Sequence, residues 1–191
     1  MAAAATVDAR RAGDIRAILF GRAPEGLALD LDLRWALWTA LAATGDAKVT
    51  ELDAEAERDD TASGRTAHLR ALAARPLAEV KAAAWESALG DTTLTNEHLD
   101  ATIDGFRAGG RRDLIARYDS DYFAALRGVW DQRSIEIARR IVVGLFPAAD
   151  SLDGVDRWLD GNAGAPNSLR RLVVEQRDHL ARELRIRGAD I

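Results

Sequence analysis

The chain has 191 residues, of which 26 are Lys or Arg and 31 are Asp or Glu, so its net charge is −5, and it contains no Cys. This length suits one domain or a short array of repeats, and a hydrophobic content of 48% excludes disorder along most of the chain. The missing Cys excludes disulfides, thiol catalysis and cysteine-based metal sites, and the negative charge argues against a nucleic-acid binder held by bulk charge.

Apolar residues recur along the whole chain at three- and four-residue spacing, and no sustained stretch alternates with period two. The pattern therefore predicts an all-α fold. Gly, Pro and capping residues separate the segments. In chain order, the expected helices cover about 7–20, 30–44, 46–58, 65–75, 76–90, 95–106, 114–118, 122–130, 134–145, 151–159 and 167–187.

Several polar residues stand where these helices should start. Asp46, Ser63, Ser134 and Ser151 are all placed to cap a helix, and capping accounts for them without a catalytic role. Many short helices with short connections favour a stack of paired helices, as in HEAT-type repeats. We see no linker, so we expect residues 1–191 to form a single helical domain with its Trp residues in the core.

The residues alone indicate no active centre. His68, His98 and His179 are far apart in sequence, so no helical zinc-binding pair is possible. The segment 109–112, Gly-Gly-Arg-Arg, could hold an anion at a helix start, but a flexible turn is the favoured interpretation. No transmembrane-length apolar run is present, and residues 1–5 do not resemble a signal peptide. We expect a cytoplasmic location and neither a membrane nor a nucleic-acid partner.

Charged residues offer two further candidates. The pairs Asp53/Glu57 and Asp100/Asp104 each share a helix face, and we interpret them as solvated surface. Arginine greatly outnumbers lysine, 24 to 2. Arg side chains can bind carboxylates through two parallel hydrogen bonds. The arginines to be watched for this role are Arg139, Arg140, Arg170 and Arg171, and surface salt bridges are the simpler explanation for each.

An ordered set of motifs carries more information than composition. Its first part runs from Leu33-Arg34-Trp35 through 51–55, 59–61 and Gly64 to the segment 81–85, Lys-Ala-Ala-Ala-Trp. Its second part keeps an aromatic spacing: Phe106, Tyr118, Tyr122-Phe123, Trp130, Leu145-Phe146-Pro147, Trp158-Leu159 and Leu169-Arg170-Arg171. In this order the motifs resemble the C-terminal helical domain of bacterial aminopeptidase N, a zinc-dependent gluzincin family, in an actinobacterial style. The resemblance covers about residues 15–187.

The resemblance implies a right-handed α–α superhelix, or HEAT-like stack, of about ten short antiparallel helices. It implies a non-catalytic domain that covers the catalytic domain of the same polypeptide, closes a chamber and binds peptide substrates. The family's zinc-binding His-Glu-x-x-His helix and its Gly-Ala-Met-Glu-Asn motif are missing here, since the only Met is Met1. No catalytic or metal-binding residue is therefore carried over, and no cofactor is expected in this chain, the zinc belonging to the parent enzyme.

Two other functions remain open. The chain could be a stand-alone HEAT-like module that binds peptides or proteins without enzymatic activity. It could also be a small-molecule enzyme of unknown type, which no residue favours. If it is part of a larger peptidase, we expect an exposed apolar or charge-complementary patch near the N-terminal helices, where the catalytic domain would attach.

Overall fold

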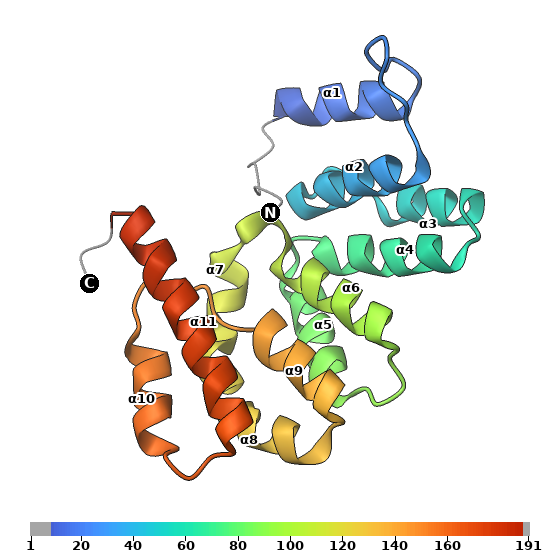
Figure 1. The fold of residues 1–191 in the computed structure, drawn as a ribbon. Coiled ribbons are helices and arrows are strands. Elements are labelled where there is room, and N and C mark those ends of the chain that lie inside the picture. Colours follow the sequence, from blue (N-terminus) through green and yellow to red (C-terminus); the bar gives the residue numbers. More distant parts are fainter. Residues whose placement is uncertain (1–8, 189–191) are drawn as a thin grey trace. The chain divides into compact units, whose positions relative to one another are not determined.

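The computed structural model describes residues 9–188, and these residues form helices and connecting loops without strands (Figure 1). The all-α prediction is confirmed. The elements in chain order are α1 (Ala9–Leu19), α2 (Leu31–Thr44), α3 (Val49–Arg58), α4 (Ala62–Ala74), α5 (Ala78–Gly90), α6 (Asn96–Arg107), η1 (Ala108–Gly110), α7 (Arg112–Ile115), η2 (Ala116–Tyr118), α8 (Asp119–Gln132), α9 (Ile135–Gly144), α10 (Asp153–Gly161) and α11 (Asn167–Ile186).

The helices match the predicted segments closely. The first expected helix begins at Val7, which lies outside the described residues. The chain groups into two compact units, Met1–Leu114 (unit 1) and Ile115–Ile191 (unit 2), with the boundary inside α7. The right-handed superhelix and the single domain expected over 1–191 stay predictions. In the described part of the chain, no helix is both long enough and apolar enough to span a membrane.

The predicted helix caps are partly right. Ser134 accepts a hydrogen bond from the backbone of Ile137 at the start of α9, as expected. The expectations for Asp46 and Ser63 were wrong, because Lys48 stands at the N-cap of α3 and Thr61 at that of α4. In each case the observed N-cap residue lies two positions from the expected one, after Asp46 in α3 and before Ser63 in α4.

The remaining predicted cap stands just outside its helix. Ser151 accepts a hydrogen bond from Asp153 N at 3.3 Å, while Leu152 takes the N-cap position of α10. The three helices α4, α6 and α9 begin with a hydroxyl cap, and in each the capping residue stands three residues before the amide that its side chain binds.

Unit 1 is built on α4, which packs against α2, α3, α5 and α6. Figure 1 shows α2 between α1 and α4. The close packing of α4 and α6 depends on Gly105, where an added Cβ would lie 2.6 Å from the carbonyl oxygen of Arg70. Small buried alanines on α4, among them Ala71 and Ala74 at 0% exposure, let the neighbouring helices approach its backbone.

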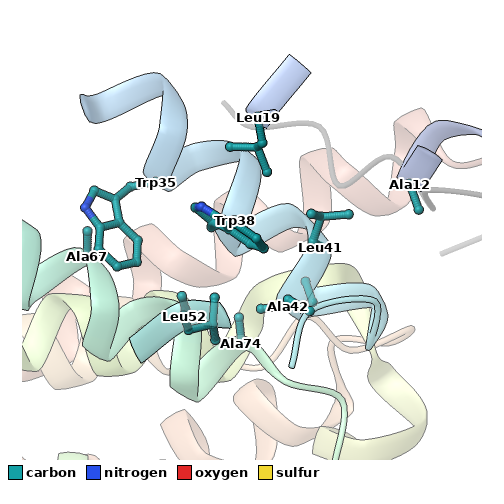
Figure 2. Packing of buried hydrophobic residues seen from close by; sticks show 12 residues of the cluster. Ala12, Leu19, Trp35, Trp38, Leu41, Ala42, Leu52, Ala67 and Ala74 are labelled. Carbon is teal, nitrogen blue, oxygen red and sulfur yellow. The ribbon is translucent and has the colours of Figure 1, made fainter. Parts of the chain in front are cut away.

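The core of unit 1 is centred on α2. Trp35, Trp38 and Leu41 are at most 4% exposed and belong to one buried cluster with Leu52 of α3 and alanines of α4. Figure 2 shows these α2 side chains turned toward that cluster. Four of the five Trp residues are buried and Trp130 is half-buried, so the expected core role of tryptophan holds for most of them.

Unit 2 has an aromatic and aliphatic core. The ring of Tyr122 packs edge-on against Phe123 and Phe146, with centroids 5.1 and 5.7 Å apart. The Tyr122 hydroxyl donates a hydrogen bond to the Val142 carbonyl at 2.7 Å, which satisfies its polar end. Leu169 of α11 is 0% exposed in the same unit. The aromatic spacing noted in the sequence therefore serves packing.

Candidate functional site

The first motif of the sequence forms a buried ion pair in unit 1. Arg34 on α2 donates from Nε and Nη2 to the two carboxylate oxygens of Glu55 on α3. Arg34 also donates from Nη1 to the carbonyl of Leu19 at 3.1 Å, and Trp38 Nε1 donates to Glu55 at 3.1 Å. Burial disfavours the Glu55 carboxylate, but the hydrogen bonds from Arg34 and Trp38 outweigh it and lower its pKa.

A second buried carboxylate extends this arrangement to α4. Trp35 Nε1 donates to Asp59 at 2.8 Å, and Thr61 Oγ1 donates to the other oxygen of Asp59 at 2.7 Å. Thr61 in turn accepts from Gly64 N at 2.9 Å and caps α4. The hydrogen bonds from Thr61 and Trp35 lower the pKa of Asp59. A Cβ at Gly64 would lie 2.6 Å from Asp59 Oδ2, so only glycine fits there.

These contacts explain several motifs that carry the family resemblance. Arg34, Trp35, Glu55, Asp59 and Gly64 come from four motifs of the sequence and lie in two hydrogen-bonded sets, which start from the neighbouring residues Arg34 and Trp35 and which we call together the network of unit 1. Every polar group of that network has a partner, which is what a buried polar cluster requires. The network holds α2, α3 and α4 together, and its polar atoms are bound to one another. Its role is therefore structural.

Lys81 is a second buried charge of unit 1. Its side chain is 0% exposed, and Nζ donates to the carbonyls of Ala73 at 2.9 Å, Ala74 at 3.1 Å and Gly105 at 2.7 Å. These carbonyls lie in the last turns of α4 and α6, where helical carbonyls lack backbone partners. Burial, assisted by the positive charge of Arg111, lowers the pKa of Lys81 to about 8.

A groove of about 930 Å³ lies on the surface of unit 1. This volume is in the range of small-ligand sites. The walls of the groove come from α2, from α4 and from the start of α6. Its lining residues are Asp32, Trp35, Ala36, Thr39, Ala62, Ser63, Arg65, Thr66, Ala67, Arg70, Thr95, Glu97 and His98. We call it the α2–α4–α6 groove.

Charges of both signs stand around the α2–α4–α6 groove. Arg65 Nη1 pairs with Asp60 at 2.7 Å, and Arg70 pairs through Nε with Asp104 at 3.3 Å. All four side chains of these pairs are at least 36% exposed, so each pair is weak and can exchange partners. The groove can therefore offer guanidinium donors to a ligand that carries a carboxylate. Sequence reasoning missed it, because the sequence does not reveal which small residues face each other.

Arg170 is one of the four arginines selected from the sequence, and it belongs to unit 2. Its Nη1 donates to the carbonyls of Leu159 and Asn162, both at 2.8 Å. These carbonyls lie at the C-terminal end of α10, so Arg170 fixes the connection between α10 and α11. The half-buried guanidinium thus has a structural task in this unit.

The other three selected arginines also lie in unit 2. Arg140 pairs with Glu136 at 2.8 Å along α9, and Arg171 pairs with Glu175 at 3.6 Å along α11. Arg139 is exposed on α9. The helices α9 and α11 pack together, but Arg140 and Arg171 each pair with a glutamate of their own helix. A role in carboxylate binding stays a prediction for all four.

The described residues do not suit a zinc ion. Zinc needs three or four His, Cys, Asp or Glu ligands in one place, and no group of three or more such residues able to hold a metal occurs among residues 9–188. His68 Nε2 lies 2.9 Å from Asp53 Oδ1. Asp53, Glu57, Asp60, Arg65 and His68 line an open hollow beside it, which matches the solvated surface expected for Asp53 and Glu57.

The described residues define an all-α protein assembled from short packed helices. A family model described as the ERAP1-like C-terminal domain matches residues 2–182, and the chain belongs to this family. The chain is also similar to Aminopeptidase N of Streptomyces lividans, with 46% identity over 171 residues. That match covers 87% of this chain and 20% of the relative, so the chain spans about a fifth of the length of the curated protein it matches.

Proposed function

We propose that the chain is the non-catalytic C-terminal domain of a cytoplasmic zinc aminopeptidase, where it forms part of a chamber wall and binds peptides. One observation carries the proposal: a match over 87% of this chain accounts for only 20% of an aminopeptidase N. The described residues do not assemble a zinc site, which supports placing the metal and the chemistry in another domain. The HEAT-like superhelical arrangement belongs to this proposal.

Peptide binding is supported by surfaces in both units. The α2–α4–α6 groove in unit 1 is lined by several small side chains and by two arginines, the exposed Arg65 and the half-buried Arg70. In unit 2, Arg139 is an exposed guanidinium. Either surface can attract the carboxylate of a peptide through charge-assisted hydrogen bonds.

A binding experiment tests this part of the proposal. Fluorescence anisotropy of a labelled peptide is measured against the purified chain, with the peptide's C-terminus either free or amidated. We expect the free carboxylate to bind more tightly, and Ala36→Trp to weaken binding by filling the groove. The matched control is Ala54→Trp, at an exposed position of α3 outside the groove.

The two candidate surfaces give different outcomes in the same experiment. Weaker binding by Ala36→Trp assigns the peptide to unit 1, whereas weaker binding by Arg139→Ala assigns it to unit 2. Equal binding of the free and amidated peptides would contradict carboxylate recognition. The absence of binding to either peptide would overturn the peptide-binding role.

Two measurements test the non-catalytic role: the hydrolysis of amino-acid anilides by the purified chain, and the sequence of the complete reading frame. We expect the purified chain, supplied with zinc, to leave amino-acid anilides unhydrolysed, and turnover with stoichiometric metal would overturn the assignment. The complete reading frame separates the proposal from a stand-alone module. A frame that continues upstream into a His-Glu-x-x-His domain supports the aminopeptidase, and a frame without such a domain supports the module.

A further inference from the structure

Unit 1 exposes three large apolar side chains within a short segment. Phe20 is 67% exposed, Leu27 41% and Leu31 43%. We call Phe20, Leu27 and Leu31 the N-terminal apolar patch. They lie at the end of α1, in the loop 21–30 and at the first residue of α2.

Two of these side chains are on the same side of α2. The ring of Phe20 contacts that of Trp38 edge-on, with centroids 6.3 Å apart. Leu31 precedes Trp38 by seven residues, which is about two turns of an α-helix, so both residues point to one face. Leu27 is presented by a turn in which its amide donates to the Pro24 carbonyl at 3.1 Å.

The loop itself is built to present apolar groups to its surroundings. It has no regular structure between α1 and α2, and all of its residues except Ala23 and Leu29 are exposed. The loop is longer than most connections between helices, which have about 2–8 residues. An exposed cluster of large apolar side chains in a soluble protein typically marks an interaction surface.

Acidic residues surround the patch and define the charge of its partner. Glu25, Asp30 and Asp32 are exposed, against one basic residue, Arg22, in the segment 20–32. Unit 1 as a whole has 19 acidic and 14 basic residues, whereas unit 2 has 12 of each. A complementary surface would therefore be apolar in its centre and basic at its rim.

We propose that the N-terminal apolar patch is the docking surface for another domain of the same aminopeptidase polypeptide, one that presents apolar side chains flanked by Arg or Lys. The inference rests on the proposed function, because the chain spans 20% of the length of Aminopeptidase N and the partner is sought in the other part of such a protein. Phe20, the most exposed of the three, is the anchor of this contact.

Hydrogen exchange followed by mass spectrometry tests the contact. The isolated chain is compared with the protein encoded by the complete reading frame. We expect the amides of residues 20–31 to exchange about tenfold more slowly in the longer protein, and added salt to reduce this protection because the rim contacts are ionic. The variant Phe20→Asp should abolish the protection. The matched control is Leu77→Asp, at an exposed apolar residue of unit 1 that lies outside the patch.

Each outcome decides the inference. Equal exchange of residues 20–31 in both proteins overturns it, as does a reading frame that encodes no other domain. Protection that survives Phe20→Asp, or that is lost equally in Leu77→Asp, also overturns the assignment to this patch. Peptide binding by the isolated chain without protection leaves the proposed peptide-binding role intact, and protection without peptide binding leaves the docking contact intact.

Discussion

The two units of the chain are stabilised in different ways. Every buried charged side chain among residues 9–188 belongs to unit 1: Arg34, Glu55, Asp59 and Lys81. The described core of unit 2 is apolar and aromatic, and its buried tyrosines are Tyr118 and Tyr122. Both lysines of the sequence are also in unit 1. Unit 1 therefore combines an apolar core with buried, hydrogen-bonded charges, whereas the described core of unit 2 holds no buried charge.

This difference has consequences for tolerance to substitution. A buried charge that loses its partner costs far more than a lost surface contact, because it stays desolvated without compensation. An apolar core responds in proportion to the volume removed. Single polar substitutions and changes of pH should therefore unfold unit 1 while unit 2 remains folded.

The largest effect is expected from Glu55→Ala, which leaves the Arg34 guanidinium buried without its carboxylate. Breaking a buried pair in this way costs about 3–5 kcal/mol. We expect the amides of α2 and α3 to lose hydrogen-exchange protection while those of α11 keep it. The matched control is Glu136→Ala, which breaks the exposed pair with Arg140 in unit 2. Equal losses in both variants would contradict the difference between the units.

A double variant sharpens this test. In Arg34→Met with Glu55→Leu, apolar side chains replace both charges, and such replacements are often neutral or stabilising. We expect most of the stability lost in Glu55→Ala to return. Continued instability would mean that the hydrogen bonds to Leu19 and Trp38 contribute more than the ion pair itself.

The second prediction concerns Gly64→Ala. The added Cβ would overlap the backbone and side chain of Asp59, and overpacking of this kind costs about 1–3 kcal/mol. Urea unfolding, followed by hydrogen exchange of the amides of α4 and α8, checks the loss. The control is Gly128→Ala in α8 of unit 2, where the nearest atom, on Gln132, is 4.0 Å away. There alanine should stabilise the helix by about 0.5–1 kcal/mol, so destabilisation of both variants would contradict the steric argument.

These residues also show what could be predicted from the sequence. The helices followed from periodicity, because each apolar spacing is local. The network did not, since Arg34, Glu55 and Asp59 resemble ordinary surface charges until the register of α2 against α3 is known. Lys81 carried a signal: it is a lone lysine in an apolar segment of α5, 80–85, with no acidic residue one turn later at position 85.

The four arginines selected from the sequence as carboxylate-binding candidates stay a prediction, and the sequence could not show which of them share a surface. Adjacent pairs such as Arg139-Arg140 were selected because they concentrate charge, but neighbours on a helix point about 100° apart. The structure accordingly gives Arg140 a partner along its helix and leaves Arg139 exposed. The α2–α4–α6 groove requires three helices in contact, and one-dimensional patterns do not contain that information.

The third prediction is the response of unit 1 to pH. The pKa values of Glu51, Glu55 and Asp59 are lowered in the folded chain, so their contribution is present above the unfolded values near 4 and is lost as the pH falls further. The pKa of Lys81 is lowered to about 8 from 10.5. Since the unfolded chain then binds more protons between these values, stability should rise with pH across this window.

Urea unfolding at a series of pH values measures the free energy of unfolding and checks both expected effects, the loss of stability in acid and the gain in alkali. We expect unit 1 to be most stable near the alkaline end and to unfold first in acid. The gain from pH 7 to 10 should be at most about 3 kcal/mol, at 1.36 kcal/mol for each unit of pKa difference. The variant Lys81→Met lacks the titrating group and should lose the alkaline gain. A gain that persists in Lys81→Met would assign it to another residue.

The smallest effects on stability are expected from two neighbouring arginines of unit 2. Arg170 binds backbone carbonyls at a helix end, whereas Arg171 forms only an exposed ion pair. Arg170→Ala removes two hydrogen bonds to the carbonyls of Leu159 and Asn162, and bonds from a charged donor contribute about 1.5–3 kcal/mol at most. Arg171→Ala breaks only a 3.6 Å pair with Glu175 between exposed side chains, so the change should stay within about 0.5 kcal/mol. Thermal unfolding of both variants, read on α10 and α11 by hydrogen exchange, measures the difference. If the two substitutions are equivalent, the helix-end contact of Arg170 contributes nothing, and unit 2 relies on its apolar core alone.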